Sequence, residues 1–185
     1  MSVTTLDPRT ALVVIDLQRG IVGLPTAHPA DEIVTRSAQL AAAFRERELP
    51  VVLVNVAGLA PGRNEGPGMS GALPDDWTLL VDGLDRQPGD ITVTKKQWGA
   101  FHGTSLDMEL RRLGVTQIVL AGISTSIGVE STARAAYDSG YHVTVAVDAV
   151  TDTDADAHAH AVGKIFPRLG ETGSTAEITA LLPAA

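Results

Sequence analysis

The 185-residue chain contains no cysteine, which excludes disulfide bonds, thiolate metal sites, iron–sulfur clusters and a thiol nucleophile. The same absence gives no indication of the redox compartment. Basic residues are also scarce, since 14 Lys and Arg stand against 22 Asp and Glu for a formal net charge of -8. A net negative charge disfavours binding to nucleic-acid backbones and anionic membranes. We therefore expect neither nucleic acid nor a membrane as a partner.

Long apolar runs are missing as well. The longest stretch without Asp, Glu, Lys or Arg, Leu113 to Val129, reaches 17 residues, and polar residues interrupt it. It is too polar for a membrane span, and the N-terminus lacks the basic cluster and apolar region of a signal peptide. We therefore expect a cytoplasmic protein by default. Length and a hydrophobic content of 44% predict one globular domain over residues 1–185.

Short apolar runs alternate along the chain with segments of helical spacing. Runs that are apolar throughout are typical of strands buried on both faces of a parallel sheet, and the alternation implies right-handed βαβ crossovers. We predict an α/β fold, a three-layer α-β-α sandwich with a mostly parallel, Rossmann-like open sheet. The expected strands are 11–15, 51–56, 91–94, 117–121 and 142–147, and the expected helices are 31–48, 105–113, 126–139 and 154–166.

One irregular stretch follows the second expected strand. Gly58 to Gly71 holds five glycines and two prolines. A phosphate-binding P-loop would end in Gly-Lys-Ser/Thr at the start of a helix, and this motif is missing. A mobile lid, an oligomer contact and an ordinary surface loop remain open as alternatives.

Charged side chains follow two of the expected strands at their carboxyl ends, where ligands bind in such sheets. Asp16 ends the first strand, and its carboxylate could face the crevice or cap the next turn. Lys95 and Lys96 follow the third strand. Because neighbouring side chains on an extended segment point to opposite sides, at most one of these lysines readily faces the crevice.

A third segment, Ala121 to Ala133, runs from a strand through a glycine-containing turn into a helix. The first amides of that helix would be free to donate hydrogen bonds to a developing anion, and the helix dipole would add to this effect. Gly128 lies at the expected elbow between strand and helix. Small residues there equally suit close packing of the helix on the sheet.

Taken together, these segments resemble the isochorismatase-like hydrolase superfamily, also called the cysteine hydrolases. The resemblance covers nearly the whole chain and rests on pieces that occur in the family's order: Ile15–Gln18, Pro88–Asp90 with Lys95–Asp107, Gly122–Ala133, Gly140–Val143 with Asp148–Ala149, and Thr175–Glu177.

The resemblance implies an active site built from an Asp, a Lys and a Cys. The Asp corresponds to Asp16. The Lys corresponds to Lys95, because in the family it stands six residues before the Phe that resembles Phe101. The Cys position, six residues after Gly122, holds Gly128. The thioester route of the family's amidases therefore lacks its nucleophile here.

No serine is expected to replace the missing thiol, because Ser126 and Ser131 would face elsewhere. The resemblance also implies a cis peptide bond between Ile123 and Ser124, and an oxyanion hole formed by the backbone amides of Ser124 and Gly128. Such backbone donors could survive the loss of the thiol.

True isochorismatases also lack the thiol, because they cleave a vinyl ether with the Asp as acid and the Lys as its partner. We therefore expect a hydrolase of a small-molecule substrate that uses acid/base chemistry through Asp16 and Lys95. Gln18, Trp98 and Phe101 are candidate substrate-binding residues, although Phe101 could equally pack in the core. The alternative is a catalytically inactive member that binds a metabolite or a partner.

The residues that read substrate carboxylates in true isochorismatases are only partly matched. Leu59 to Gly62 stands where the family has Gln-Pro-Gly, Arg63 is uncertainly aligned, and Ser124 stands in place of a Tyr. We therefore expect a natural substrate other than isochorismate.

Metal binding is not expected. Nicotinamidases in the family use an Asp-x-His after the second strand, and the corresponding Asn55 to Ala57 has neither ligand. The segment Asp154 to His160 alternates acidic and His residues, but residues two apart on a helix lie about 200° apart. It is typical of a solvated helix start. By resemblance we expect no cofactor and a homodimer or larger homo-oligomer.

Overall fold

A six-stranded sheet forms the centre of the structure, a computed structural model that describes residues 2–65 and 73–183. The strand order is β3-β2-β1-β4-β5-β6, and each neighbouring pair is parallel. This confirms the predicted α/β sandwich with an open parallel sheet. The strands are β1 Thr10–Ile15, β2 Val51–Val56, β3 Ile91–Lys95, β4 Gln117–Ile123, β5 His142–Thr151 and β6 Glu171–Gly173.

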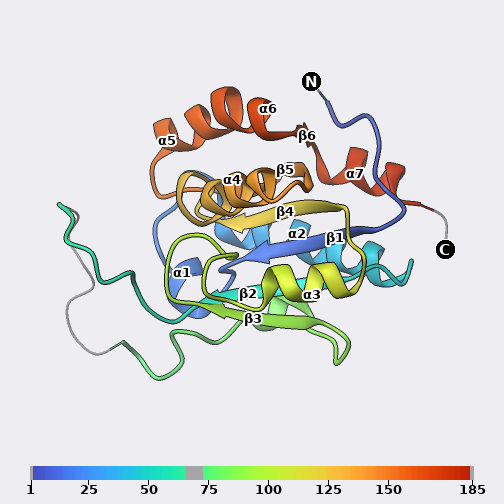
Figure 1. Cartoon of the computed structure of the whole chain (residues 1–185). Coiled ribbons are helices and arrows are strands. Elements are labelled where there is room, and N and C mark those ends of the chain that lie inside the picture. Colours follow the sequence, from blue (N-terminus) through green and yellow to red (C-terminus); the bar gives the residue numbers. More distant parts are fainter. Residues whose placement is uncertain (1, 66–72, 184–185) are drawn as a thin grey trace.

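Helices cover both faces of the sheet, with α3 and α4 in front of it and α2 behind it in Figure 1. The α-helices are α1 Arg19–Val22, α2 Ala30–Arg45, α3 Leu106–Arg112, α4 Glu130–Asp138, α5 Ala155–His160, α6 Phe166–Leu169 and α7 Thr175–Leu181. The shorter helical turns are η1 Asp82–Leu84, η2 Thr125–Val129 and η3 Ala161–Ile165.

The core lies on both sides of the sheet because successive side chains of a strand point to opposite faces. Ala11, Val13 and Ile15 of β1 join the cluster under α3, α4 and α6. Leu12 and Val14 join the cluster under α2 and α7. The fully apolar pattern of β1 thus follows from burial on both faces.

The predicted strands and helices differ from the described ones mainly at their ends, and the short helices α1 and α7 were not predicted. β6 was not predicted, because Glu171-Thr-Gly173 is short and carries two polar residues. β5 continues to Thr151 through Asp148, whose carboxylate accepts hydrogen bonds from the amide and hydroxyl of Thr175. The helix predicted over 126–139 begins as the π-helical turn η2 and becomes α-helical only in α4.

The carboxyl ends of the central strands meet at one edge of the sheet, as the arrows of β1 and β4 show in Figure 1. At this edge Gly122 of β4 pairs with Ile15 of β1. Gly122 has a φ of 115°, and a Cβ there would lie 2.0 Å from the carbonyl oxygen of Ile15. Only glycine therefore allows the two strands to approach so closely.

None of the described helices is long and apolar enough to cross a membrane.

Candidate active site

A cavity of about 220 Å³ lies at the carboxyl edge of the sheet. Its floor is formed by residues at the ends of β1, β3 and β4, and the segments around α1 and Trp77 form part of its wall. The lining residues are Asp16, Ile21, Leu24, Val56, Gly58, Leu59, Trp77, Lys95, Gln97, Trp98, Ile123, Ser124, Ile127, Gly128 and Thr153.

Asp16 and Lys95 form an ion pair at the floor of this cavity. The Nζ of Lys95 donates a hydrogen bond of 2.7 Å to the Oδ2 of Asp16 and one of 3.1 Å to the carbonyl oxygen of Gln97. The two residues are 5% and 2% exposed. Lys96, in contrast, is exposed, so the strand geometry brings only Lys95 into the crevice.

The other carboxylate oxygen of Asp16, Oδ1, is buried and has no hydrogen-bond partner within residues 2–65 and 73–183. Burial raises the pKa of Asp16 from 3.8 to about 6, although the positive charge of Lys95 and its hydrogen bond act in the opposite direction. A carboxyl group with such a pKa can hold a proton near neutral pH and can release it. This property suits a general acid or base.

Gly128 of η2 lies beside this carboxylate. A Cβ at Gly128 would be 3.3 Å from the Oδ2 of Asp16 and 2.9 Å from the Cγ2 of Ile15. The elbow therefore faces the ion pair, and any larger residue would need Ile15 to shift. Ser126 faces elsewhere as predicted, because its amide and hydroxyl both donate to the Oδ2 of Asp152, at 2.6 and 2.8 Å.

The peptide bond between Ile123 and Ser124 is cis, as the resemblance implied. Both residues line the cavity between the end of β4 and the elbow. The assignment of the Ser124 and Gly128 amides as oxyanion donors remains a prediction.

Two residues expected to bind substrate lie outside the cavity lining. Gln18 is fully buried, and its Nε2 donates to the carbonyl oxygens of Val56 and Trp77 while its Oε1 accepts from the amide of Val56. Phe101 packs against the core, with its ring centroid 5.7 Å from that of Tyr141. Gln18 therefore bonds the backbone of the cavity wall and Phe101 packs in the core, while their assignment as substrate-binding residues stays a prediction.

Trp98 lines the cavity and is 58% exposed. Its contact with a substrate remains a prediction. Sequence reasoning missed Trp77, which forms another part of the wall. The signal for it was Gly20 of α1, because a Cβ there would lie 2.1 Å from the Trp77 indole. The Trp77 indole packs against α1 at Gly20, where the absence of a side chain leaves room for the ring.

The glycine-rich stretch contributes Gly58 and Leu59 to the lining. Residues 66–72 of this stretch lie outside the described residues, so its predicted role as a lid, oligomer contact or surface loop is not tested.

The segment Asp154 to His160 is a helix start, as predicted. The Asp154 carboxylate caps α5 by accepting from the amides of Asp156 and Ala157. His158 shares a hydrogen bond of 2.9 Å with the hydroxyl of Thr125, and burial together with neighbouring His28 lowers its pKa. Among the residues that the structure describes, no group of three His, Cys, Asp or Glu side chains could hold a metal ion.

Comparison with known proteins identifies the family. Residues 10–177 match the isochorismatase domain. The chain belongs to the isochorismatase family. An uncharacterized isochorismatase family protein of Escherichia coli O157:H7, YecD, is 44% identical over 178 residues, which are 91% of this chain and 94% of that protein.

Solved structures of other isochorismatase-fold proteins share this architecture. An isochorismatase family protein from Burkholderia thailandensis is 46% identical and superposes with a TM-score of 0.94, covering 98% of this chain and 99% of that one. N-carbamoylsarcosine amidase from Thermoplasma acidophilum is 28% identical with a TM-score of 0.74, covering 90% and 96% of the two chains. Members of the isochorismatase family are hydrolases, and this chain is a hydrolase-like member of that family.

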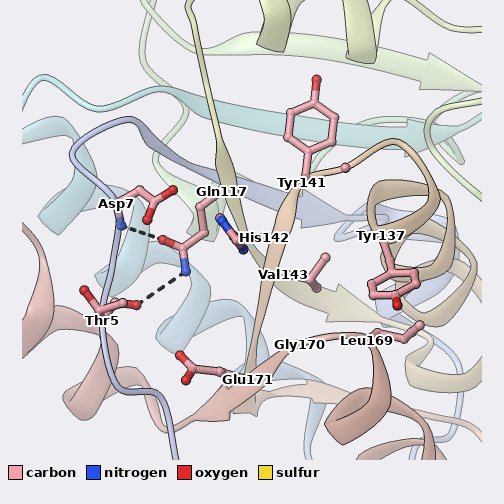
Figure 2. A pocket seen from close by; sticks show the side chains of 11 residues that line it. Thr5, Asp7, Gln117, Tyr137, Tyr141, His142, Val143, Leu169, Gly170 and Glu171 are labelled. Atoms are coloured by element: carbon pink, nitrogen blue, oxygen red, sulfur yellow. Dashed lines mark hydrogen bonds between the residues drawn. The ribbon is translucent and has the colours of Figure 1, made fainter.

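A second hollow, of about 470 Å³, lies at the opposite edge of the sheet, where Gln117, His142 and Glu171 begin β4, β5 and β6. Figure 2 shows the Gln117 side chain reaching the chain segment with Thr5 and Asp7. Its Oε1 accepts from the Asp7 amide at 2.6 Å, and its Nε2 donates to the Thr144 hydroxyl at 3.0 Å. The amide of Gln117 is therefore used within the fold, and the smaller cavity is the better candidate site.

Proposed function

We propose that this isochorismatase-family protein hydrolyses a small-molecule substrate by acid/base chemistry, with Asp16 as the acid or base and Lys95 as its positioning partner. One observation carries the proposal. Asp16 lines the cavity, one of its carboxylate oxygens is buried without a hydrogen-bond partner in the described part of the chain, and Lys95 holds the other oxygen at 2.7 Å. A buried polar atom of this kind normally has a partner, and a substrate or its attacking water can supply one.

Thiol chemistry is not open to this chain, because it contains no cysteine. We assign Gly128 to the position of the family's nucleophile. Its hydrogen in place of a side chain leaves the space beside the Oδ2 of Asp16 clear, since a Cβ would stand only 3.3 Å away. The amides of Ser124 and Gly128 are proposed as donors to developing negative charge on the substrate.

Vinyl-ether hydrolysis is a reaction that these groups can perform. Protonated Asp16 gives its proton to the terminal carbon of the enol ether, and the resulting oxocarbenium ion takes the oxygen of a water molecule. The carboxylate of Asp16 accepts the proton that this water loses, so the group is restored. The hemiketal then separates into a carbonyl compound and an alcohol. With a pKa of about 6, the carboxyl group of Asp16 is protonated in a fraction of the molecules near neutral pH, whereas an Asp with an ordinary pKa is almost fully ionised there.

The test sets vinyl ethers against amides in a hydrolysis screen with chelator-treated protein. We expect turnover of vinyl ethers but not amides, and Asp16→Asn should lower it by about 10² to 10⁴, the usual contribution of an acid or base. Because Asp16→Asn leaves Lys95 buried without its partner, the double variant Asp16→Asn/Lys95→Met serves as a folded control, checked by its circular dichroism spectrum.

Full turnover by Asp16→Asn, or hydrolysis of amides alone, would refute the proposed mechanism. Binding of small molecules without hydrolysis of either class would instead support the alternative, an inactive family member that binds a metabolite.

A further inference from the structure

We propose that the cavity takes a small, uncharged substrate with an apolar body and discriminates against carboxylates, because apolar walls surround a lysine whose charge is already neutralised by Asp16. The inference rests on the proposed function in one respect only, namely that this cavity is the site that receives the substrate.

The walls of the cavity are apolar. Apart from Asp16 and Lys95, the polar side chains in the described lining are those of Gln97, Ser124 and Thr153. Apolar side chains make up most of the rest: Ile21, Leu24, Val56, Leu59, Trp77, Trp98, Ile123 and Ile127. A pocket of this composition gains affinity by removing apolar ligand surface from water.

Lys95 is the sole cationic side chain in the described lining. Its Nζ already donates to Asp16 and to the Gln97 carbonyl, so it has little capacity left for a substrate carboxylate. The residues outside the described ranges, 1, 66–72 and 184–185, include no Lys or Arg side chain. Arg19, which begins α1, is engaged outside this lining with Asp76 at 3.2 Å and Asp82 at 3.8 Å.

A carboxylate in this cavity would therefore lose its hydration without a free cation in the lining to replace it, and it would lie near the carboxylate of Asp16. Burial of a charge without a partner is strongly unfavourable. An uncharged group carries no such penalty, and a hydrogen-bond donor on it can bond the carboxylate of Asp16, which lines the cavity.

The cavity is also small. Its volume of about 220 Å³ corresponds to about seven water molecules at roughly 30 Å³ each, which is below the range of roughly 300–1,000 Å³ for pockets that hold drug-sized ligands. The Trp77 indole limits it on one side. Gln18 and the Gly20 amide both bond the Trp77 carbonyl, at 3.0 and 3.1 Å, which holds this wall in place.

Intrinsic fluorescence provides a direct binding test, because the chain has two tryptophans and both line the cavity. Phenylacetamide and phenylacetate serve as probes, since they share shape and apolar body and differ in charge. At about pH 8, where Asp16 is ionised, we expect phenylacetamide to change the fluorescence at a concentration at least about tenfold lower than phenylacetate. The dicarboxylate isophthalate should bind no better than phenylacetate.

A variant that adds a cation should reverse this preference. Leu24 lines the cavity and is 44% exposed, so Leu24→Arg can fold normally and should improve phenylacetate binding about tenfold or more. Met108→Arg is the matched control, because Met108 of α3 is 51% exposed and lies outside the cavity lining. It should leave both affinities unchanged.

Equal binding of phenylacetate and phenylacetamide, tighter binding of isophthalate, or no response to millimolar phenylacetamide would overturn the inference. The outcomes also separate it from the proposed function. Selective binding of uncharged probes, with no hydrolysis of any vinyl ether in the screen, would retain the inference and refute the enzyme. Turnover of a dicarboxylate that depends on Asp16 would retain the enzyme and refute the inference.

Discussion

A hollow lies at each of two ends of the sheet, and the two hollows differ in whether their polar side chains have hydrogen-bond partners within the fold. At the amino ends of β4, β5 and β6 the hollow is larger, about 470 Å³, and Gln117 and Glu171 bond to the N-terminal segment. At the carboxyl ends the cavity is about 220 Å³, and one oxygen of Asp16 lacks a partner among the described residues. An unpartnered carboxylate oxygen beside a buried lysine, rather than size, therefore marks the candidate site.

The difference has a physical origin in how the chain enters and leaves the strands. At the amino edge, Thr4 and Asp7 precede β1 and run across the starts of β4 and β6, where their backbone amides meet the side chains of Gln117 and Glu171. At the carboxyl edge, the segments that follow the strands leave a cavity lined mainly by apolar side chains. At the first edge the side chains of Gln117 and Glu171 are bonded, and only the hydroxyl of Thr10 lacks a partner among the described residues of that edge, whereas at the second edge a carboxylate oxygen of Asp16 lacks one.

The largest expected effect concerns a glycine at each edge. A Cβ would lie 2.0 Å from the Ile15 oxygen at Gly122 and 2.0 Å from the Val143 oxygen at Gly170. Gly170→Ala should cost about 1–3 kcal/mol for overpacking. Gly122→Ala should cost about 2–6 kcal/mol, because its φ of 115° adds about 1–3 kcal/mol of strain.

Urea unfolding of both variants at one pH measures these costs as free energies of unfolding. Gly103 offers a control, because its φ of 65° strains an alanine while nothing stands within 4 Å of a Cβ there. If Gly122→Ala were no more destabilising than Gly103→Ala, close strand approach would not be what requires Gly122.

The second expected effect is a loss of turnover, which should follow replacement of a lysine at the carboxyl edge but not of an arginine near the amino edge. Lys95→Met removes the buried partner of Asp16, so the pKa of Asp16 should rise further and its carboxylate should lose its orientation. We expect turnover to fall about 10²-fold or more. Arg111→Met, near the amino edge, removes an exposed pair with Asp107, a hydrogen bond to the Ser139 carbonyl and a contact with the Tyr141 ring, and should cost about 1–3 kcal/mol of stability but no activity.

Steady-state kinetics over several pH values measures this effect, because a purely structural role of Lys95 would lower activity without moving the pH profile. A profile for Lys95→Met that coincides with that of the unaltered protein would show that Lys95 does not tune Asp16.

The parts of this molecule that were predictable from sequence are those with a simple physical signal. β1, β2 and β4 are apolar runs buried in a parallel sheet, and the carboxyl ends of β1 and β3 meet at one edge, which predicts a lysine near Asp16; the family resemblance selected Lys95 over Lys96. The glycine elbow at Gly128 is likewise where the sequence predicted it, beside the Asp16 carboxylate.

The cavity walls were not predictable to the same degree. Trp77 lies in an irregular connection without periodicity, and only packing against Gly20 reveals its position. Gln18 was misassigned because a polar residue after a strand can face either a ligand or the backbone, and its side chain bonds the backbone of Val56. Such choices depend on contacts between segments far apart in the sequence.

The smallest expected effect is the change in the free energy of unfolding with pH, and the sign of this change should differ between the two edges. Burial raises the pKa of Asp16 from 3.8 to about 6, so the folded state holds a proton more tightly than the unfolded chain between these values. The free energy of unfolding should therefore fall by at most about 3 kcal/mol as pH rises from about 4 to about 6. Asp16→Asn should abolish this slope in urea titrations.

Glu171 at the amino edge should act in the opposite direction. Burial favours a higher pKa, but hydrogen bonds from the hydroxyl and amide of Thr4 outweigh it and lower the pKa of Glu171 below 4.5. The ionised group therefore stabilises the fold above pH 4.5 and ceases to do so as pH falls through its lowered pKa. Glu171→Gln should remove this acid-side loss and leave the Asp16 slope intact. Equal slopes in both variants would mean that neither carboxylate accounts for the difference between the edges.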